Sequence, residues 1–203
     1  LLIWSMVIAG GVITWIFITD GVHDTAFRLS EQLQPLYLQQ IGGLTLAQIG
    51  LLGSFFSAAM MVTPLLSGKL ADRHGERLPI ALGFLVIGGS IAIFLVAKAY
   101  PAFILVWVLA GCGEGLLSPA YQSLISKAVP IESLGAFNGI FYSSVGFIAL
   151  PAPWIGAQLW ERYTPQLPFF ITMVVCFLSV IPIWFKFRLP QKAAIGSVQE
   201  GAT

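Results

Sequence analysis

Charged residues are scarce in this sequence. Only 9% of its 203 residues are charged and 57% are hydrophobic, whereas a soluble globular domain carries roughly 25% charged residues. So few charges could not cover a water-soluble fold with this much apolar surface, which excludes a disordered chain and almost any soluble enzyme. The 10 Lys and Arg against 9 Asp and Glu give a formal net charge of +1, so a basic face for nucleic acid is excluded as well. The composition predicts a protein that spans a membrane several times.

Cysteine is rare too, and both residues, Cys112 and Cys176, lie inside apolar runs. They lack the close spacing of metal ligands, and two such residues make no disulfide framework. We therefore interpret them as small apolar side chains and expect neither a metal site nor a cofactor. The sequence starts with Leu1 instead of Met, from which we expect it to begin inside a longer protein.

Long apolar runs are what the sequence has instead. A membrane-spanning helix needs about 20 mostly apolar residues, and six segments qualify, at about 3–38, 46–67, 79–97, 102–126, 134–160 and 168–187. Their short links make successive helices antiparallel neighbours. The predicted fold is an all-α membrane protein over residues 1–190, arranged as two inverted three-helix units. Residues 191–203 are predicted to form a polar tail.

Lysine and arginine are distributed unevenly between the two ends of these segments. Seven of the ten lie in the links after the second and fourth segments and in the C-terminal region, and the other three lie at the opposite end. Because cytoplasmic loops carry the excess of positive charge, we expect both ends of the chain to be cytoplasmic. The expected location is a cell membrane, crossed several times.

The link between the second and third segments carries the most specific pattern. It reads GKLADRHGER at residues 68–77. By itself this is a positively charged turn with flexible glycines, but the order resembles the loop signature of the major facilitator superfamily, G-x-L-A-D-R-x-G-R-[KR]. Glu76 departs from that signature at its ninth position. The matching residues are Gly68, Leu70, Ala71, Asp72, Arg73, Gly75 and Arg77.

The resemblance extends over the whole chain. PLYL at 35–38 followed by AQIG at 47–50, and residues 111–120, look like the family's first, second and fourth helices. Since the family is built of two six-helix halves, the resemblance implies that this chain is one half and that its partner is the other half of the same protein. The missing Met favours the C-terminal half, while residues 146–156 faintly resemble an antiporter motif of the N-terminal half. The resemblance also implies a cytoplasmic latch formed by Gly68, Asp72, Arg73, Gly75 and Arg77, which would gate transport without binding substrate.

Ionisable residues gather on one face of the first segment. At 100° per residue, Asp20, His23, Asp24 and Arg28 share that face, and Glu31 continues it further out. Charges at membrane depth are costly, so such residues are functional candidates that face a cavity. Asp24 and Arg28 are spaced to form an ion pair. The alternative is an ordinary extracellular helix end in contact with water.

Glu114 lies near the middle of the fourth segment, between Gly113 and Gly115, with no basic residue within a turn or two. It is a candidate to carry a proton or to contact substrate; alternatively it stays protonated and hydrogen-bonds another helix. Gln122 and Tyr142, with Asn138, could add neutral hydrogen bonds to the same cavity, although helix packing explains these three equally well. The tryptophans lie mostly near the ends of the segments, where interfacial anchoring is the default, and Trp15 is the one we consider for cavity lining.

These observations predict a secondary transporter that moves a small organic solute by alternating access. Asp20, Asp24 and Glu114 suggest coupling to protons. Cationic or amphipathic molecules, sugars and organic acids all stay open as substrates, as do symport and antiport. Two other classes are weaker. A six-span membrane-embedded hydrolase would need a nucleophile near a base, and no G-x-S-x-G is present. A channel or a non-transporting scaffold is the other alternative, and the sequence contains no filter-like segment that would indicate a channel.

Overall fold

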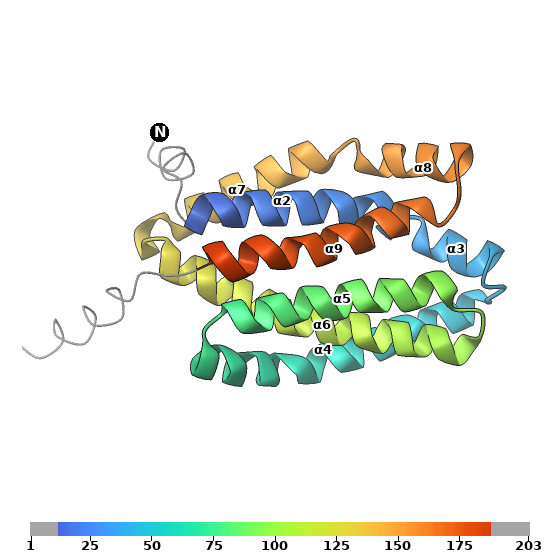
Figure 1. Cartoon of the computed structure of the whole chain (residues 1–203), viewed down its shortest axis with the longest axis horizontal. Coiled ribbons are helices and arrows are strands. Elements are labelled where there is room, and N and C mark those ends of the chain that lie inside the picture. Colours follow the sequence, from blue (N-terminus) through green and yellow to red (C-terminus); the bar gives the residue numbers. More distant parts are fainter. Residues whose placement is uncertain (1–11, 188–203) are drawn as a thin grey trace, which may run out of the picture.

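Helices make up all the regular structure of this computed structural model, which describes residues 12–187, and no strand occurs in that range. In chain order they are α2 (Val12–Glu31), α3 (Gln34–Gln40), α4 (Leu46–His74), α5 (Arg77–Val96), α6 (Tyr100–Ala128), the short 3-10 helix η1 (Ile131–Ser133), α7 (Leu134–Ala149), α8 (Ala152–Arg162) and α9 (Leu167–Lys186). The long helices run along a common direction (Figure 1). The predicted tail at 191–203 lies outside the described residues.

Five stretches of the described chain are long and apolar enough to cross a membrane: Leu46–His74, Arg77–Val96, Tyr100–Ala128, Ile131–Arg162 and Leu167–Lys186. The remaining long helix, α2, has 20 residues but carries Asp20, Asp24, Arg28 and Glu31. It nevertheless lies within the bundle, between α9 and the α7–α8 pair (Figure 1). The prediction of an all-α membrane protein is confirmed.

Two of the expected segments are each broken into two helices. The first segment breaks after Glu31, and α3 then begins with Pro35 in its first turn. The fifth, expected at 134–160, breaks after Ala149, where Pro151 and Pro153 flank the start of α8. Proline has no N–H to donate and its ring clashes with the preceding turn. Continuous hydropathy therefore did not reveal that each of these two segments is broken into two helices.

The packing of the helices has an internal symmetry. α6 packs against α4 and α5, while α2 packs against the α7–α8 pair and α9, and α5 packs against α9. Exchanging α2 with α6, α4 with α7–α8, and α5 with α9 converts each of these contacts into another member of the set. This is the arrangement expected of two three-helix units that repeat with inverted topology.

Both ends of the described chain lie at one end of the bundle. The start of α2, the end of α4, the end of α6 and the end of α9 all meet there (Figure 1). We call this the motif end, because it carries the link at residues 68–77, and we call the opposite end the α3 end. Within each three-helix unit the chain thus crosses the bundle three times, so it leaves the unit at the end of the bundle opposite to the one where it entered.

The apolar core is divided into two clusters along the bundle. One gathers at the motif end around Ile16, Phe84 and Phe137. The other gathers at the α3 end around Tyr37 and Phe103. Neither Asp20 of α2 nor Glu114 of α6 belongs to either cluster. The division of the core leaves room for a polar site inside the bundle.

Candidate functional site: a cavity between α2 and α6

A cavity of about 530 Å³ lies inside the bundle, with walls from α2, α4, α5, α6 and α9. α2 and α6 hardly touch one another. α2 instead packs closely on α9 and the α7–α8 pair, and α6 packs closely on α4 and α5. The space between α2 and α6 is therefore not closed by helix packing. α5 and α9, which pack on each other, complete its walls.

The α2 wall contributes four of the predicted ionisable residues: Asp20, His23, Asp24 and Glu31 line the cavity. Arg28 is not part of the lining. Its Nε donates to Oδ2 of Asp24 over 2.7 Å, which is the ion pair that the spacing predicts, and the two side chains are 46% and 30% exposed. The positive charge of Arg28 therefore offsets the negative charge of Asp24 at a partly hydrated site.

The α6 wall contributes Glu114, which is half-buried and lines the same cavity. A Cβ at Gly113 would lie 2.6 Å from the side chain of Ile87 on α5, and a Cβ at Gly115 would lie 2.9 Å from that of Thr63 on α4. The two glycines therefore let α6 approach both neighbouring helices closely. With these flanks packed, the carboxyl group of Glu114 is left on the face toward α2.

Aromatic rings supply much of the remaining lining: Phe27, Phe56, Phe94, Trp107 and Phe169. The ring centroids of Phe94 and Phe169 are 4.9 Å apart, and those of Phe94 and Trp107 are 5.9 Å apart. Trp107, for which interfacial anchoring was the default, thus lines the cavity. Trp15 does not, and its ring instead lies under Nζ of Lys186, 5.4 Å from the centroid. The position of a tryptophan near a helix end therefore could not distinguish lining of the cavity from anchoring at the membrane interface.

His23 has an unusual polar environment. Its ring meets Phe84 edge to face, with centroids 4.7 Å apart. Its Nε2 atom is buried and has no hydrogen-bond partner among the residues that the structure describes. A buried ring nitrogen without a partner is uncommon, and here it belongs to a side chain that lines the cavity.

Three other predicted residues lie away from the cavity. Gln122 is exposed, Tyr142 is 57% exposed, and Asn138 is half-buried, and none of them is part of the lining. Their residue types gave no information on which side of α6 or α7 they occupy. Across residues 12–187, no group of three or more His, Cys, Asp or Glu side chains is placed to hold a metal ion.

The signature at 68–77 is mostly helical. α4 continues through His74, so Gly68, Asp72 and Arg73 lie on its last turns, and all three are exposed. Gly75 ends the helix with a φ of 80°, a left-handed conformation that glycine adopts without a steric penalty. Arg77 Nη1 donates to the carbonyl oxygen of Trp184 over 3.5 Å. Asp72 has no hydrogen bond or ion pair with any residue of the described range.

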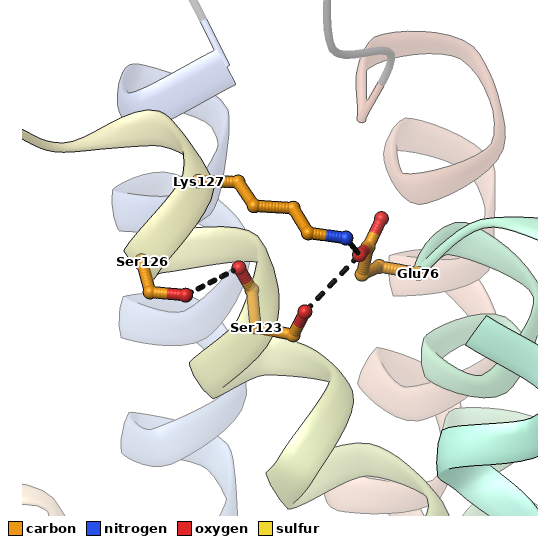
Figure 2. Close-up of polar contacts among 4 residues, drawn as sticks. All are labelled: Glu76, Ser123, Ser126 and Lys127. Carbon is orange, nitrogen blue, oxygen red and sulfur yellow. Dashed lines mark hydrogen bonds and ion pairs between the residues drawn. The ribbon is translucent and has the colours of Figure 1, made fainter. Parts of the chain in front are cut away.

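Glu76, the residue that departs from the signature, is the buried member of this link. It is only 7% exposed, and Figure 2 shows it reaching across to the end of α6. Lys127 donates to its Oε1 and forms an ion pair with it, and Ser123 Oγ donates to the same oxygen over 3.1 Å. Burial by itself would raise the pKa of Glu76, but these hydrogen bonds and the charge of Lys127 outweigh it and hold the pKa below its ordinary value. Sequence reasoning missed this pair, for which the reversed charge at the ninth position was the available signal.

The fold and the cavity together define a multi-pass helical membrane protein with an internal cavity lined by aromatic and ionisable side chains. The chain belongs to the Major Facilitator Superfamily, whose family model matches residues 2–202. This confirms the resemblance carried by residues 68–77. It also places the chain in a family of membrane transporters and not among membrane-embedded hydrolases.

Relatives and solved structures agree with this assignment. The chain is 27% identical over 171 residues to an uncharacterised MFS-type transporter of Methanocaldococcus jannaschii, a match that covers 84% of this chain and 44% of that protein. It is 28% identical over 170 residues to the quinolone resistance protein NorA of Staphylococcus aureus, covering 82% and 42%. A mutant of the peptide transporter POT, crystallised with sulfate, has the same fold, with a TM-score of 0.69 at 21% identity over 84% of this chain and 36% of that one. The chain thus spans less than half the length of the relatives that it matches.

Proposed function

We propose that the complete protein is a secondary active transporter that moves a small organic solute across a cell membrane through the cavity between α2 and α6, driven by protons. The observation that carries this proposal is the placement of Asp20 and Glu114, from two different helix units, on the walls of one cavity. Membership of the superfamily supports transport as the activity. Both ends of the chain are expected in the cytoplasm, in line with the positive charges at the motif end.

Alternating access gives the two carboxyl groups a role. Two ionised carboxylates facing one cavity repel each other, and closing the cavity removes the water that screens them. A proton on either group lowers that repulsion. Proton binding therefore favours the closed and reoriented states over the open one, which is what coupling requires. His23 and Asp24 also face this cavity from α2, and Arg28 offsets the charge of Asp24.

A second six-helix unit completes the proposed transporter. The relatives are more than twice as long as the matched region, and rocking of one unit against another is how such folds expose a central site to each side in turn. The partners of this chain are then the other half of the protein, the lipid bilayer, a small-molecule solute and protons. No nucleic acid is involved.

The test is transport by the complete protein in proteoliposomes under an imposed pH gradient. A sugar, an organic acid and tetraphenylphosphonium serve as probe solutes. At least one is expected to accumulate with the gradient, and Glu114→Gln is expected to reduce that accumulation at least tenfold while solute exchange without a gradient continues. Glu132→Gln, an exposed carboxylate on η1, is the matched control and is expected to transport normally.

Two results would contradict the proposal. Unchanged proton dependence in Glu114→Gln would remove that residue from the coupling. Flux that neither saturates nor shows counterflow would indicate a channel instead of a carrier.

A further inference from the structure

A second cavity, of about 620 Å³, lies between α4 and α6 and shares no lining residue with the first. Its α6 wall is formed by Cys112 and Leu116. Each of these is two residues away from Glu114, so both lie about 160° from it around the helix. Since Glu114 lines the first cavity, the second cavity lies on the opposite flank of α6. We call it the lateral groove.

The part of the lateral groove nearer the middle of the bundle is apolar. Leu66 and Leu70 of α4 line it together with Leu116 of α6. The two walls are joined beside it, where Ser67 Oγ donates to the carbonyl oxygen of Leu116 over 2.6 Å. Leu66 is 54% exposed, on a helix that is long and apolar enough to cross a membrane. Exposed apolar side chains in such a groove offer a surface for the acyl chain of a lipid.

The part of the lateral groove at the motif end is basic. Lys69, Arg73 and His74 line it from the last turns of α4, and all three side chains are exposed. Lys69 and Arg73 are four residues apart, so they are neighbours on one face of the helix. Neither forms an ion pair with an acidic side chain of residues 12–187. Asp72, which lies between them in the chain, is not part of the lining. Two neighbouring positive charges therefore lie at the mouth of an apolar groove.

We propose that the lateral groove binds an anionic phospholipid, with its phosphate between Lys69 and Arg73 and an acyl chain on the apolar part. The inference goes beyond the proposed function, because this site lies on the other flank of α6 from the solute cavity.

The charge and the polarity of the groove match such a lipid. Arg73 and Leu66 are seven residues apart, about 10 Å along the helix, and a phospholipid spans that distance from its phosphate into its acyl chains. The excess of Lys and Arg predicts that the motif end is cytoplasmic. Basic pockets between membrane-spanning helices on that side suit anionic head groups.

Two lipids with the same acyl chains test this choice. Dioleoylphosphatidylglycerol is anionic and dioleoylphosphatidylcholine is zwitterionic. Native mass spectrometry of the complete purified protein, released from detergent, measures the binding of each. Phosphatidylglycerol is expected to bind about tenfold more tightly, because two basic side chains contribute. Glycerol 3-phosphate carries a phosphate without acyl chains and is expected not to displace it, which distinguishes a lipid from a free phosphate.

Variants separate the two parts of the groove. Lys69→Gln and Arg73→Gln are each expected to weaken phosphatidylglycerol binding about fivefold and to leave phosphatidylcholine unchanged. Lys69→Arg keeps the charge and is expected to bind as the unmodified protein does. Leu66→Trp is expected to weaken both lipids, since its ring occupies the place of the acyl chain. Lys98→Gln, an exposed lysine beyond the other end of α5, is the matched control and is expected to bind normally.

Three results would overturn the proposal: equal binding of the two lipids, displacement of phosphatidylglycerol by glycerol 3-phosphate, or unchanged affinity in both Lys69→Gln and Arg73→Gln. A complete protein that binds neither lipid would overturn it too, and would indicate that the second six-helix unit covers the groove. Transport under a pH gradient is a separate measurement, so a failure of the proposed function leaves these outcomes unaffected.

Discussion

Glu76 illustrates how a single residue can change its meaning between sequence and structure. In the signature it replaces a positive charge, and in the fold it accepts hydrogen bonds from Lys127 and Ser123 at the far end of α6. It therefore ties the start of α5 to the end of α6 at the motif end (Figure 2). A charge-assisted hydrogen bond at a buried carboxylate contributes more than one at the surface.

Removing this charge is expected to destabilise the protein modestly. Glu76→Gln weakens the bonds from Lys127 and Ser123, at a cost of about 1 kcal/mol in the free energy of unfolding, since Lys127 itself is largely exposed. Thermal melting of the purified protein in detergent at pH 7 measures it. Glu161→Gln, an exposed carboxylate on α8, is the control and should melt normally. A wild-type melting temperature in Glu76→Gln would show that the pair contributes nothing.

The same residue predicts a pH dependence. Because the pKa of Glu76 in the folded protein lies below its ordinary value of 4.5, its stabilisation is present above that value and is lost as the pH falls through the folded pKa. The difference in melting temperature between Glu76→Gln and the unmodified protein should therefore shrink between pH 7 and pH of about 3. A difference that stays constant over that range would assign the effect to packing instead of charge.

Candidate residues in the cavity differed in how visible they were in the sequence. Asp20, His23, Asp24 and Glu114 stood out because ionisable groups are rare in apolar helices. Trp107 did not, because tryptophan at a helix end is also typical of interfacial anchoring. Polar residues such as Gln122 did not indicate whether they face the cavity, since a helix of high overall hydropathy does not reveal which face is buried. Residue type predicts a cost of burial, but not the neighbour that offsets it.

At the scale of the helices, two close crossings bring the backbones of neighbouring helices into contact. A Cβ at Gly156 of α8 would overlap the carbonyl oxygen of Leu29 on α2, and one at Gly111 of α6 would overlap that of Phe56 on α4. The two crossings correspond under the exchange of the three-helix units. Both rely on glycine to bring backbones together, as in other membrane helix pairs.

Adding a methyl group at one crossing is expected to disturb it. Gly156→Ala should destabilise the protein by about 1–3 kcal/mol, because the carbonyl of Leu29 is backbone and cannot move aside as a side chain could. Gly139→Ala on α7, where the added Cβ meets open space, is the matched control, and better helix propensity should leave it unchanged or slightly more stable. Thermal melting compares the two. Equal melting temperatures would mean that α8 shifts away at little cost.

At the scale of the whole molecule, we propose that the signature at 68–77 acts in the change between transport states. Asp72 and Arg73 are exposed on the last turns of α4, and within residues 12–187 Asp72 has no partner. A latch that joins two halves would need such a residue to be free on this unit. The cavity lies elsewhere along α4, around Gly53 and Phe56, so the proposed latch and the proposed solute site are separate in space.

Asp72→Asn is therefore expected to slow turnover by about an order of magnitude, or roughly 1.4 kcal/mol in the barrier, while solute affinity stays nearly unchanged. Transport in proteoliposomes and equilibrium binding of the same probe give the two quantities. Glu161→Gln again serves as the control at an exposed carboxylate. Normal turnover in Asp72→Asn would count against the latch.

Sequence by itself determined the solvent, the fold class and the family of this protein. Apolar runs of about 20 residues can be satisfied only as helices in lipid, and the signature at 68–77 lies in a link whose position follows from the order of those runs. Both properties are local in the chain, so they can be read without coordinates.

Tertiary structure alone decided which residues meet. Asp20 and Glu114 are 94 positions apart in the chain, and they share a cavity because α2 and α6 pack on α5 and α9 without closing on each other. The pairing of Glu76 with Lys127, and the position of Trp107 in the lining, depend on the same crossings. Hydropathy reports how much of a helix avoids water, whereas the rotation of each helix about its axis is set by packing against its neighbours.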